Sequence, residues 1–369
     1  MKALTVFGTR PEAIKMCPLV LELQSHPTIE SEVCVTGQHR SMLDQVLDIF
    51  GVKPDYDLDI MKPRQTINTI TTSVLEKMED VLDKSRPDIV LVHGDTTTSM
   101  AAALAAFYAR IPVGHVEAGL RTYNIYSPFP EEMNRKIISA IATFHFAPTK
   151  GNEHALNREG ISEHVYVTGN TVIDAFKYTA KPNYEFKNEA LRLHDFSQPT
   201  ILLTAHRREN IGKPLENICT AINQLCAKHS NLRFIYPVHL NPAVRDTVFS
   251  LLGNNPQVSL IDPVDVEDMH NAMLRSILVL TDSGGLQEEA PHLGKPVVVL
   301  RTETERPEAV QAGTAVVAGV DADDIFDITD NLISNKSAYE KMSRAINPYG
   351  DGHASERIAR ALEYEFVGK

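Results

Sequence analysis

The chain has no tryptophan and only four cysteines in 369 residues. Cys17, Cys34, Cys219 and Cys226 are scattered, with no C-x-x-C pair and no metal-type spacing. This pattern predicts free thiols in a reducing compartment, and it argues against a disulfide framework or a zinc site. We therefore expect a cytoplasmic protein that holds no metal.

Long hydrophobic runs and excess positive charge are missing as well. The longest apolar stretch, residues 100–109, is about half of the roughly 20 residues that a membrane-spanning helix needs. The chain enters an expected strand at Ala3–Phe7, so we expect no signal peptide. The 36 Lys and Arg against 48 Asp and Glu give a formal net charge of −12, which disfavours a nucleic-acid or anionic-membrane surface. A cleft with its own local field can still bind an anionic nucleotide.

Several common catalytic motifs do not occur. There is no Walker, H-E-x-x-H or G-x-S-x-G pattern, and no G-x-G-x-x-G. The last of these absences weakens the case for a dehydrogenase that uses a dinucleotide.

What the chain does have is short β-branched runs that alternate with longer amphipathic segments, the pattern of βαβ units in an α/β fold. The pattern starts again after Asp195, and the polar segment 181–195 separates the halves. We predict two Rossmann-like, doubly wound domains, at 1–180 and 196–352, facing each other across a cleft, and a final helix at 353–366. The expected strands are Ala3–Phe7, Glu32–Thr36, Asp88–Val92, Val113–Val116, Phe144–Ala147, Val165–Thr168, Thr200–Thr204, Arg233–Pro237, Val258–Ile261, Ile277–Thr281, Pro296–Leu300 and Ala315–Val317.

The segment after the strand at 277–281 has the features of a nucleotide-diphosphate site. Ser283, Gly284 and Gly285 put bare backbone N–H groups at the start of an expected helix, where anions bind favourably. Glu289, one turn later, can accept hydrogen bonds from ribose hydroxyls. The alternative is a tight turn with a capped helix, which would not require Glu289.

In the first half, charged residues follow the expected strands. Arg10 and Lys15 lie at a helix start where they can hold phosphate. For Arg10 we favour this function, whereas for Lys15 alone solvated surface charge is the favoured interpretation. Asp95 is a candidate acid or the N-cap of the next helix. Glu117 lies among apolar residues at a strand end, where burial would be costly without a function.

Two more groups complete the candidates. Glu131 and Glu132 open another helix, where stabilisation by the helix dipole is the alternative explanation. In the second half, His206 and Arg207 follow a strand, and His239 follows the next one. Each histidine can transfer a proton or bind phosphate, or be a satisfied structural side chain.

Six ordered segments across nearly the whole chain resemble the non-hydrolysing UDP-N-acetylglucosamine 2-epimerase family. They are Phe7–Glu12, Gly94–Thr96, His115–Arg121, Phe129–Arg135, His206–Asn210 and Asp282–Gly285.

This resemblance implies a GT-B-type fold whose final helix packs back on the first domain. It implies reversible interconversion of UDP-GlcNAc and UDP-ManNAc without a cofactor or metal, for polysaccharide biosynthesis. In the family, UDP leaves C1 by anti elimination to give 2-acetamidoglucal and then adds back with inversion at C2. A homodimer is a further expectation from the family.

The resemblance also implies residue roles. Asp95, Glu117 and Glu131 would be the acids and bases, and which of them removes the C2 proton stays open. His206 would assist catalysis at the diphosphate. Substrate-binding residues would be Arg10, Lys15, Arg135, Arg207, His239, Ser283, Gly284, Gly285, Glu289 and Arg306. Val264 and Met269 stand where relatives often have Gln and Phe near the uracil. Gln38, His39 and Arg64 resemble an allosteric substrate site.

Three alternatives stay open. A GT-B glycosyltransferase would share the nucleotide site and would need an acceptor. A hydrolysing relative would release free ManNAc. A nucleotide-sugar sensor would bind UDP and leave the C2 proton untouched.

Overall fold

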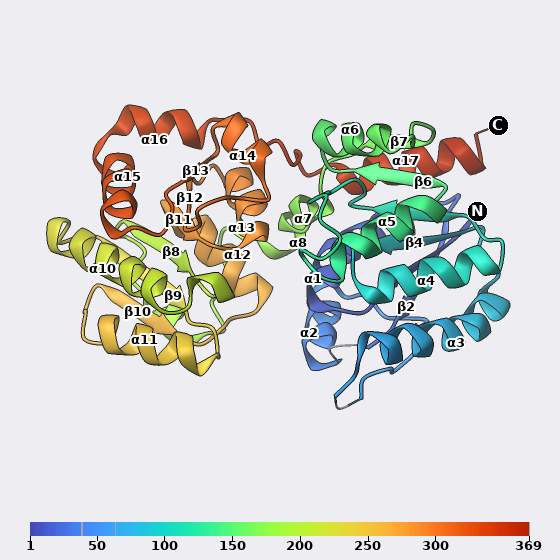
Figure 1. The fold of residues 1–369 in the computed structure, drawn as a ribbon, viewed down its shortest axis with the longest axis horizontal. Helices are drawn as coiled ribbons and strands as arrows, with labels where there is room; N and C mark the ends of the chain where they lie inside the picture. Colours follow the sequence, from blue (N-terminus) through green and yellow to red (C-terminus); the bar gives the residue numbers. More distant parts are fainter. Residues whose placement is uncertain (38–39, 63, 369) are drawn as a thin grey trace. The chain divides into compact units, whose positions relative to one another are not determined.

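The computed structural model describes residues 1–37, 40–62 and 64–368. The chain forms two compact units (Figure 1). Unit 1 contains Met1–Tyr178 and the residues from Tyr349 onward, and unit 2 contains Thr179–Pro348. Each unit has its own parallel sheet with helices on both faces. The predicted fold class, two Rossmann-like doubly wound units, is therefore confirmed.

Unit 1 alternates strands and helices along the chain. Its elements are β1 (Lys2–Phe7), α1 (Arg10–Ser25), β2 (Glu30–Val35), α2 (Arg40–Phe50), β3 (Tyr56–Asp57), α3 (Ile67–Ser85), β4 (Ile89–His93), α4 (Thr97–Tyr108), β5 (Val113–Val116), α5 (Glu131–Ile141), β6 (Phe144–Ala147), α6 (Lys150–Arg158), β7 (Val165–Val167), α7 (Thr171–Asp174), α8 (Phe176–Thr179), which ends at the unit boundary, and α17 (Ala354–Phe366).

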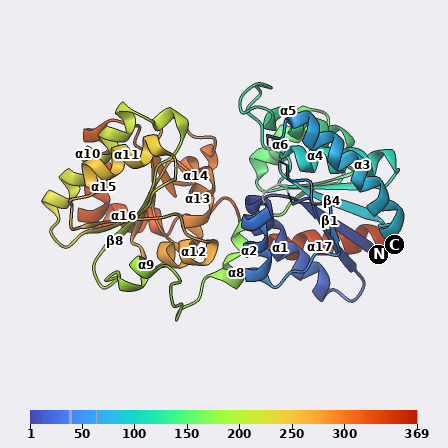
Figure 2. The same ribbon diagram turned by 90° about the horizontal axis from the view of Figure 1, so that it is seen from below.

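The sheet of unit 1 has the order β3-β2-β1-β4-β5-β6-β7, with all pairs parallel. Helices α1, α2 and α17 cover one face, and α3, α4 and α5 cover the other (Figure 2). Because both faces are covered, the strands are apolar along their length, as in β4, which is buried throughout.

Unit 2 repeats the pattern with fewer strands. Its elements are α9 (Glu189–Leu193), β8 (Thr200–Thr204), the 3₁₀ turn Arg208–Asn210, α10 (Lys213–Lys228), β9 (Arg233–Pro237), α11 (Pro242–Leu252), β10 (Val258–Ile261), α12 (Val266–Arg275), β11 (Leu278–Thr281), α13 (Gly284–Glu289), the 3₁₀ turn Ala290–Leu293, β12 (Val297–Val299), α14 (Pro307–Ala312), β13 (Ala315–Val317), α15 (Ala322–Ser334) and α16 (Lys336–Ser343). The sheet order is β10-β9-β8-β11-β12-β13, again parallel.

Each sheet changes its winding direction beside its first strand. In unit 1 the chain moves from β1 to β2 on one side and later to β4 on the other, and in unit 2 it moves from β8 to β9 and later to β11. The loops that leave the carboxyl ends of such neighbouring strands diverge over opposite faces, which makes this point the usual ligand site of open α/β sheets. The loops after β1, β4, β8 and β11 are therefore the ones to inspect.

All twelve predicted strands are present within a few residues of their expected bounds. The structure adds β3, a two-residue strand that offers no apolar run from which it could be predicted. Residues 181–195, taken from the sequence as a linker, lie in unit 2 and contain α9. Asp268 binds this segment by accepting hydrogen bonds from the amides of Lys187 (3.0 Å) and Asn188 (2.8 Å).

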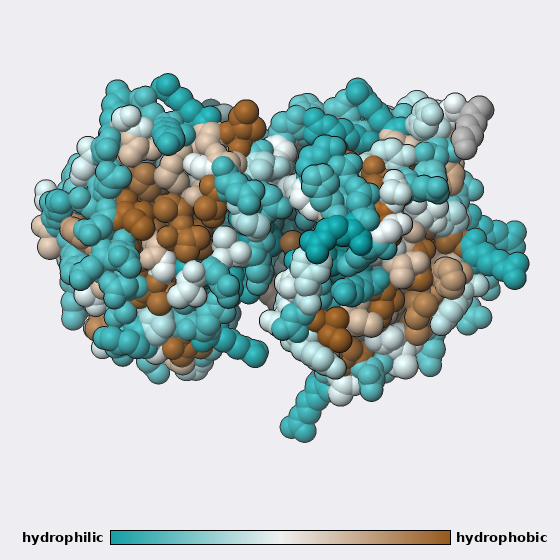
Figure 3. Space-filling view, turned by 45° about the horizontal axis from the view of Figure 1, so that its top comes forward, coloured by the Kyte–Doolittle hydropathy of each residue, from teal (hydrophilic) through white to brown (hydrophobic). Residues whose placement is uncertain are grey.

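Hydrophilic residues cover most of the face shown in Figure 3, with apolar patches on each unit. Within the described ranges, no helix combines the length and the apolar character that crossing a membrane requires. All four cysteines are buried free thiols, as their spacing predicts.

The final helix, α17, is capped by a carboxylate from another part of unit 1. Asp174 of α7 accepts hydrogen bonds from the amides of Ala354 (3.1 Å) and Ser355 (2.9 Å), which are the first two residues of α17. His353, at the N-cap position, makes no side-chain cap. Ile358 and Leu362 then bury their side chains in the core with α1. Asp174 thus joins the last helix to the amino-terminal part of the unit.

We expect Asp174→Ala to loosen α17, because two helix amides lose their acceptor and N-cap losses cost about 0.5–2 kcal/mol. Hydrogen exchange read by mass spectrometry should show faster exchange in residues 354–366. Asp327→Ala, at an exposed position of α15, is the matched control and should leave this exchange unchanged. Equal protection of α17 in Asp174→Ala and wild type would refute the capping role.

Candidate active site

The loops after β1 and β4 are joined by the carboxylate of Glu12. One of its oxygens accepts hydrogen bonds from the amides of Gly8 (3.0 Å) and Thr9 (2.8 Å). The other accepts hydrogen bonds from the hydroxyls of Thr96 (2.6 Å) and Ser99 (2.9 Å). Gly8 has no room for a side chain, since a Cβ there would lie 1.9 Å from Thr36 Oγ1. Close packing and one buried acid therefore fix this edge of unit 1.

Asp95 follows β4 and does not cap α4. Thr96 is the N-cap, accepting a hydrogen bond from the amide of Ser99 at 3.0 Å, so the capping alternative for Asp95 is wrong. The carboxylate of Asp95 instead accepts a hydrogen bond from Arg135 Nη1 at 2.5 Å. Removal from water raises the pKa of Asp95 above its ordinary value, because it outweighs the attraction of Arg135. Asp95 therefore favours its protonated form more than an ordinary aspartic acid does.

Arg135 is itself held by Glu132, one turn earlier on α5. Both side chains are almost completely buried, and Glu132 Oε2 lies 2.8 Å from Arg135 Nη2. Glu132 also accepts hydrogen bonds from the amides of Thr122 and Tyr123, each at 3.0 Å. Burial alone would raise the pKa of Glu132, but the amide bonds and Arg135 outweigh it and lower that pKa. Glu132 is thus a charged anchor that fixes Arg135 and the loop before α5.

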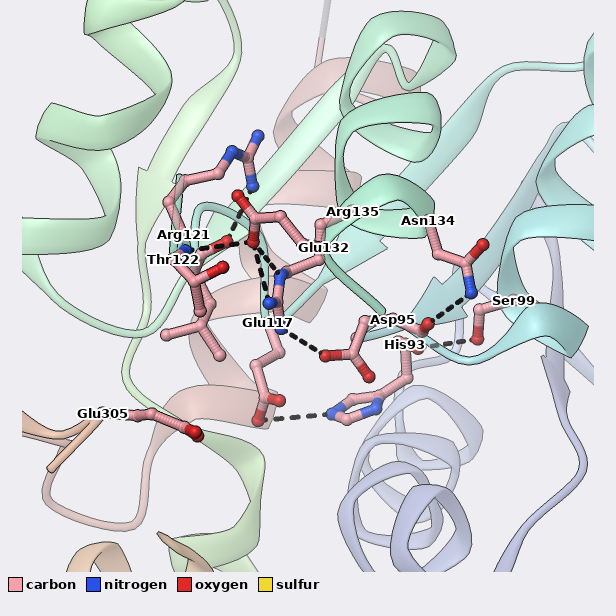
Figure 4. Close-up of polar contacts among 12 residues, drawn as sticks. His93, Asp95, Ser99, Glu117, Arg121, Thr122, Glu132, Asn134, Arg135 and Glu305 are labelled. Carbon is pink, nitrogen blue, oxygen red and sulfur yellow. Dashed lines mark hydrogen bonds and ion pairs between the residues drawn. The ribbon is translucent and has the colours of Figure 1, made fainter. Parts of the chain in front are cut away.

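Several donors contact one carboxylate oxygen of Glu117, and Figure 4 shows its contact with His93. Its Oε2 forms a short ion pair with Lys15, accepts a hydrogen bond from Asn170 Nδ2 at 2.8 Å, and lies 3.5 Å from His93 Nε2. Burial would raise the pKa of Glu117, but Lys15 and His93 hold it well below its usual range. The alternative that Lys15 is a solvated surface charge is wrong, because only 15% of its side chain is exposed.

The backbone around these acids is constrained. Glu117 has φ of +64°, a conformation that side chains other than glycine rarely adopt and that is often found at functional sites. His115, two residues earlier, is buried in β5, and its Nε2 lies 2.7 Å from the carbonyl oxygen of Gly94. Burial lowers the pKa of His115 to about 3, so the ring is neutral and donates its Nε2–H to that carbonyl. This bond holds the turn that presents Asp95.

Two predicted residues of unit 1 have simpler surroundings. Arg10 is the half-buried first residue of α1, next to the N-cap Thr9. Glu131 is the half-buried first residue of α5, and its carboxylate has no ion pair among the described residues. The structure thus joins Asp95 to Arg135 and Lys15 to Glu117, and it leaves Glu131 outside these pairs.

In unit 2, Asp282 at the end of β11 organises the loop after β8. Its Oδ2 accepts hydrogen bonds from the amides of His206 (2.7 Å) and Arg207 (2.8 Å) and from Asn210 Nδ2 (3.0 Å). The rings of His206 and His239 are stacked, with centroids 5.6 Å apart. Burial lowers the pKa of His206, although Asp282 acts in the opposite direction. His206 therefore favours its neutral form.

Two guanidinium groups approach the Ser283–Gly285 turn. A Cβ built on Gly284 would lie 3.7 Å from Arg306 Nη2 and 3.9 Å from Arg207 Nη2. Arg306 is oriented by an ion pair with buried Glu288. Ser283 is the N-cap of α13, and its side chain makes no cap hydrogen bond. Backbone amides and two cations therefore meet at one small surface, as anion binding requires.

Glu289 and the residues predicted near the uracil lie close to α12. Glu289 Oε2 is 3.1 Å from His270 Nε2, and His270 Nδ1 is 2.7 Å from the Thr179 hydroxyl. Val264 is buried just before α12, and Met269 is half-buried within it. His270 thus orients Glu289 next to the anion-binding turn.

The predicted second substrate site is only partly described. Gln38 and His39 lie outside the described residues. Arg64 is exposed, with φ of +57°.

Four residues that contribute to the geometry were not among the predicted site residues: His93, Asn170, Glu132 and His270. Glu132 was a candidate with the helix dipole as the alternative explanation and received no role from the family resemblance, although its spacing of three residues from Arg135 on a helix was a usable signal. Asn170 and His270 contact the site from distant parts of the chain, which no local pattern reveals. In the part of the chain that the structure describes, no cluster of three or more His, Cys, Asp or Glu side chains can hold a metal ion.

The neighbours Glu131 and Glu132 should differ sharply in their effect on stability. Glu132→Ala leaves Arg135 buried without its partner, and breaking such a pair costs about 3–5 kcal/mol. Glu131→Ala breaks no ion pair in the described structure and should cost less than about 1 kcal/mol. Hydrogen exchange of unit 1 peptides in increasing urea separates the two, and similar losses in both variants would contradict the anchoring role of Glu132.

This contribution should depend on pH. Since the folded-state pKa of Glu132 is lowered, its stabilisation is complete above the unfolded pKa of about 4.3 and is lost as the pH falls through the folded pKa. The difference in unfolding free energy between wild type and Glu132→Ala should therefore shrink below about pH 4. A difference that grows on acidification would contradict this sign.

Comparison with known proteins matches nearly the whole chain. A family model described as UDP-N-acetylglucosamine 2-epimerase matches residues 21–363. The UDP-N-acetylglucosamine 2-epimerase of Bacillus subtilis strain 168 is 52% identical over 367 residues, which cover 99% of this chain and 96% of the relative.

Two solved structures with ligands have the same fold. The Neisseria meningitidis UDP-GlcNAc 2-epimerase bound to UDP-GlcNAc is 51% identical, with a TM-score of 0.90 and coverage of 98% of this chain and 99% of that one. The Methanocaldococcus jannaschii enzyme in complex with UDP-GlcNAc and UDP is 34% identical, with a TM-score of 0.80 and coverage of 99% and 100%. The chain belongs to the UDP-N-acetylglucosamine 2-epimerase family.

Proposed function

We propose that this protein interconverts UDP-GlcNAc and UDP-ManNAc as a non-hydrolysing 2-epimerase. In this proposal UDP leaves C1 by anti elimination, 2-acetamidoglucal forms, and UDP adds back after a proton reaches the opposite face of C2. Elimination and re-addition move a proton and UDP and transfer no hydride, so this route needs no redox cofactor. Family membership supports the substrate, and the environments of the acids support the reaction type.

The observation that carries the proposal is the contrast between Asp95 and Glu117. Burial raises the pKa of Asp95, whereas Lys15 and His93 lower that of Glu117. Two neighbouring carboxyl groups with opposite shifts are what an acid and a base require at one pH. A binding protein without turnover has no need of this contrast.

We assign the two roles accordingly. Glu117, whose pKa is lowered, takes the C2 proton as the base, and Asp95, whose pKa is raised, delivers a proton to the other face of C2 as the acid. In the reverse direction the two residues exchange roles, as microscopic reversibility demands. Because Glu117 is a weak base with a lowered pKa, departure of UDP must run ahead of proton removal, and the carboxylate also stabilises the oxocarbenium-like ring.

Unit 2 supplies the stabilisation of the leaving group. The C2 proton is not adjacent to a carbonyl, so elimination depends on charge stabilisation at the departing diphosphate. Arg207, Arg306 and the Ser283–Gly285 amides offer this stabilisation, and His206 donates a hydrogen bond or a proton. Glu289, oriented by His270, binds the ribose hydroxyls.

Proton NMR of UDP-GlcNAc with the purified protein in D₂O tests the proposal without any added metal, cofactor or acceptor. Deuterium at C2 together with new UDP-ManNAc is the expected result. An unchanged substrate would favour a glycosyltransferase or a sensor, and free ManNAc would indicate the hydrolysing reaction.

The exchange at C2 should depend on each carboxyl group. Asp95→Asn and Glu117→Gln should each slow it by about 10²–10⁴-fold, the usual contribution of a general acid or base. Glu131→Gln is expected to slow it as well if the third acid contacts the sugar. Asp80→Asn, on the exposed face of α3, is the control and should retain the wild-type rate. Full activity of Glu117→Gln would refute the assignment of the base.

Substitution of the adjacent residues Arg207 and Arg208 tests the proposed nucleotide site. Arg207→Gln removes a guanidinium beside Gly284, so UDP affinity measured by calorimetry should fall about 10–100-fold, as for a charged hydrogen bond. Arg208→Gln, at the exposed neighbouring position, should leave UDP affinity within about threefold. Equal effects of the two changes would mean that UDP senses only general positive charge.

A further inference from the structure

His93 is a buried histidine next to the proposed base that the sequence analysis did not select. It ends β4, and only 6% of its side chain is exposed. Its Nε2 is buried and has no hydrogen-bond partner among the described residues, and the nearest carboxylate oxygen, Glu117 Oε2, is 3.5 Å away. A buried ring nitrogen without a partner is costly, so its retention calls for a functional reason.

The backbone that carries the ring is fixed independently of Glu117. The backbone oxygen of His93 accepts a hydrogen bond from the Ser99 hydroxyl at 2.6 Å, and β4 pairs with β5 so that His93 lies opposite Val116. Glu117 follows Val116 directly. The ring and the carboxylate are therefore held by neighbouring strands, and a small movement brings them to hydrogen-bond distance. Catalytic hydrogen bonds are often long before substrate binds and tighten afterwards.

All donors around Glu117 converge on one oxygen. Lys15 and Asn170 bind Oε2, and His93 points toward the same atom (Figure 4). Oε1 accepts no hydrogen bond within the described chain, and a Cβ built on Gly94 would lie 3.7 Å from it. The carboxylate is thus held through Oε2 while Oε1 stays available for a proton.

We propose that His93 is a positioning residue for the reaction, donating its Nε2–H to Glu117 Oε2 during turnover so that Oε1 is aimed at the C2 proton. This inference rests on the proposed epimerase function and deepens it. His93 contacts no substrate atom in this proposal. It completes, with Lys15 and Asn170, the set of donors that keeps Glu117 charged.

The other groups near Glu117 define what a pH experiment can report. Lys15 faces it from α1 and Asp95 from the loop after β4. Arg135 of α5 pairs with Asp95. Removing the His93 donor destabilises the Glu117 carboxylate, so the pH below which kcat/KM falls should move upward. A purely structural histidine would not move it.

The test compares His93→Leu, which removes the donor, with His93→Gln, whose amide can place an N–H near the same point. His145→Leu is the matched control: it removes an equally buried imidazole from β6, with no described contact to either acid. Each variant is assayed for C2 exchange in D₂O over a range of pH, giving kcat and KM separately. A melting curve for each preparation verifies folding.

We expect kcat of His93→Leu to fall about 10–100-fold with KM nearly unchanged, as for loss of a hydrogen bond to a charged group, and its acid limb to move to higher pH. His93→Gln should recover most of kcat, and His145→Leu should keep the wild-type kcat and acid limb. An unmoved acid limb in folded His93→Leu, or an equal loss in His145→Leu, would overturn the inference. If His93→Leu does not fold, His93→Asn, whose shorter amide does not reach Glu117, takes its place, and a wild-type kcat and acid limb in folded His93→Asn would overturn the inference instead. Absence of exchange in wild type would refute the proposed function itself.

Discussion

The structure around the candidate site depends on how it accommodates buried carboxylates at the ends of parallel strands. A carboxylate that leaves water must find hydrogen bonds or opposite charge, or it will take up a proton. Glu12 and Asp282 accept hydrogen bonds from backbone amides of the adjacent loop. Glu132 uses two amides and Arg135. These three acids do no chemistry in our account, and each one fixes a loop that carries a residue with a proposed role.

The carboxyl groups of Asp95 and Glu117 differ from these three in their partners, and they are the two to which we assign chemistry. Asp95 has one close cation, which does not offset its loss of water, whereas Lys15 and His93 together hold the pKa of Glu117 well below its usual range. The difference arises from which helices face the two loops: α5 brings Arg135 to Asp95, and α1 brings Lys15 to Glu117. The left-handed backbone at Glu117 adds strain that the surrounding sheet must offset.

Most of the fold and part of the candidate site could be predicted from the sequence. The partners of the buried acids could not, for physical reasons. Apolar runs predict the strands because both faces of each sheet are covered, and glycine and proline mark the loops where Arg10 and Ser283 lie. The charge state of an acid, however, depends on partners far away in the chain. Lys15 and Glu117 are separated by 102 residues, and Asn170 and Glu117 by 53. Thr96 rather than Asp95 caps α4, because two adjacent residues compete for one position and a pattern cannot decide between them.

The two units use the same strand order at the same point of the sheet and place different chemical groups there. In unit 1 the loops after β1, β4 and β5 collect carboxyl groups, and in unit 2 the loops after β8 and β11 collect arginines and bare amides. An elimination that separates an anionic diphosphate from a cationic sugar ring requires both kinds of surface. A transferase would need the cationic surface equally, but it would not need two carboxyl groups with opposed pKa shifts. The roles proposed for the acids of unit 1, more than the nucleotide site proposed in unit 2, therefore separate the epimerase proposal from the other reactions that this fold supports.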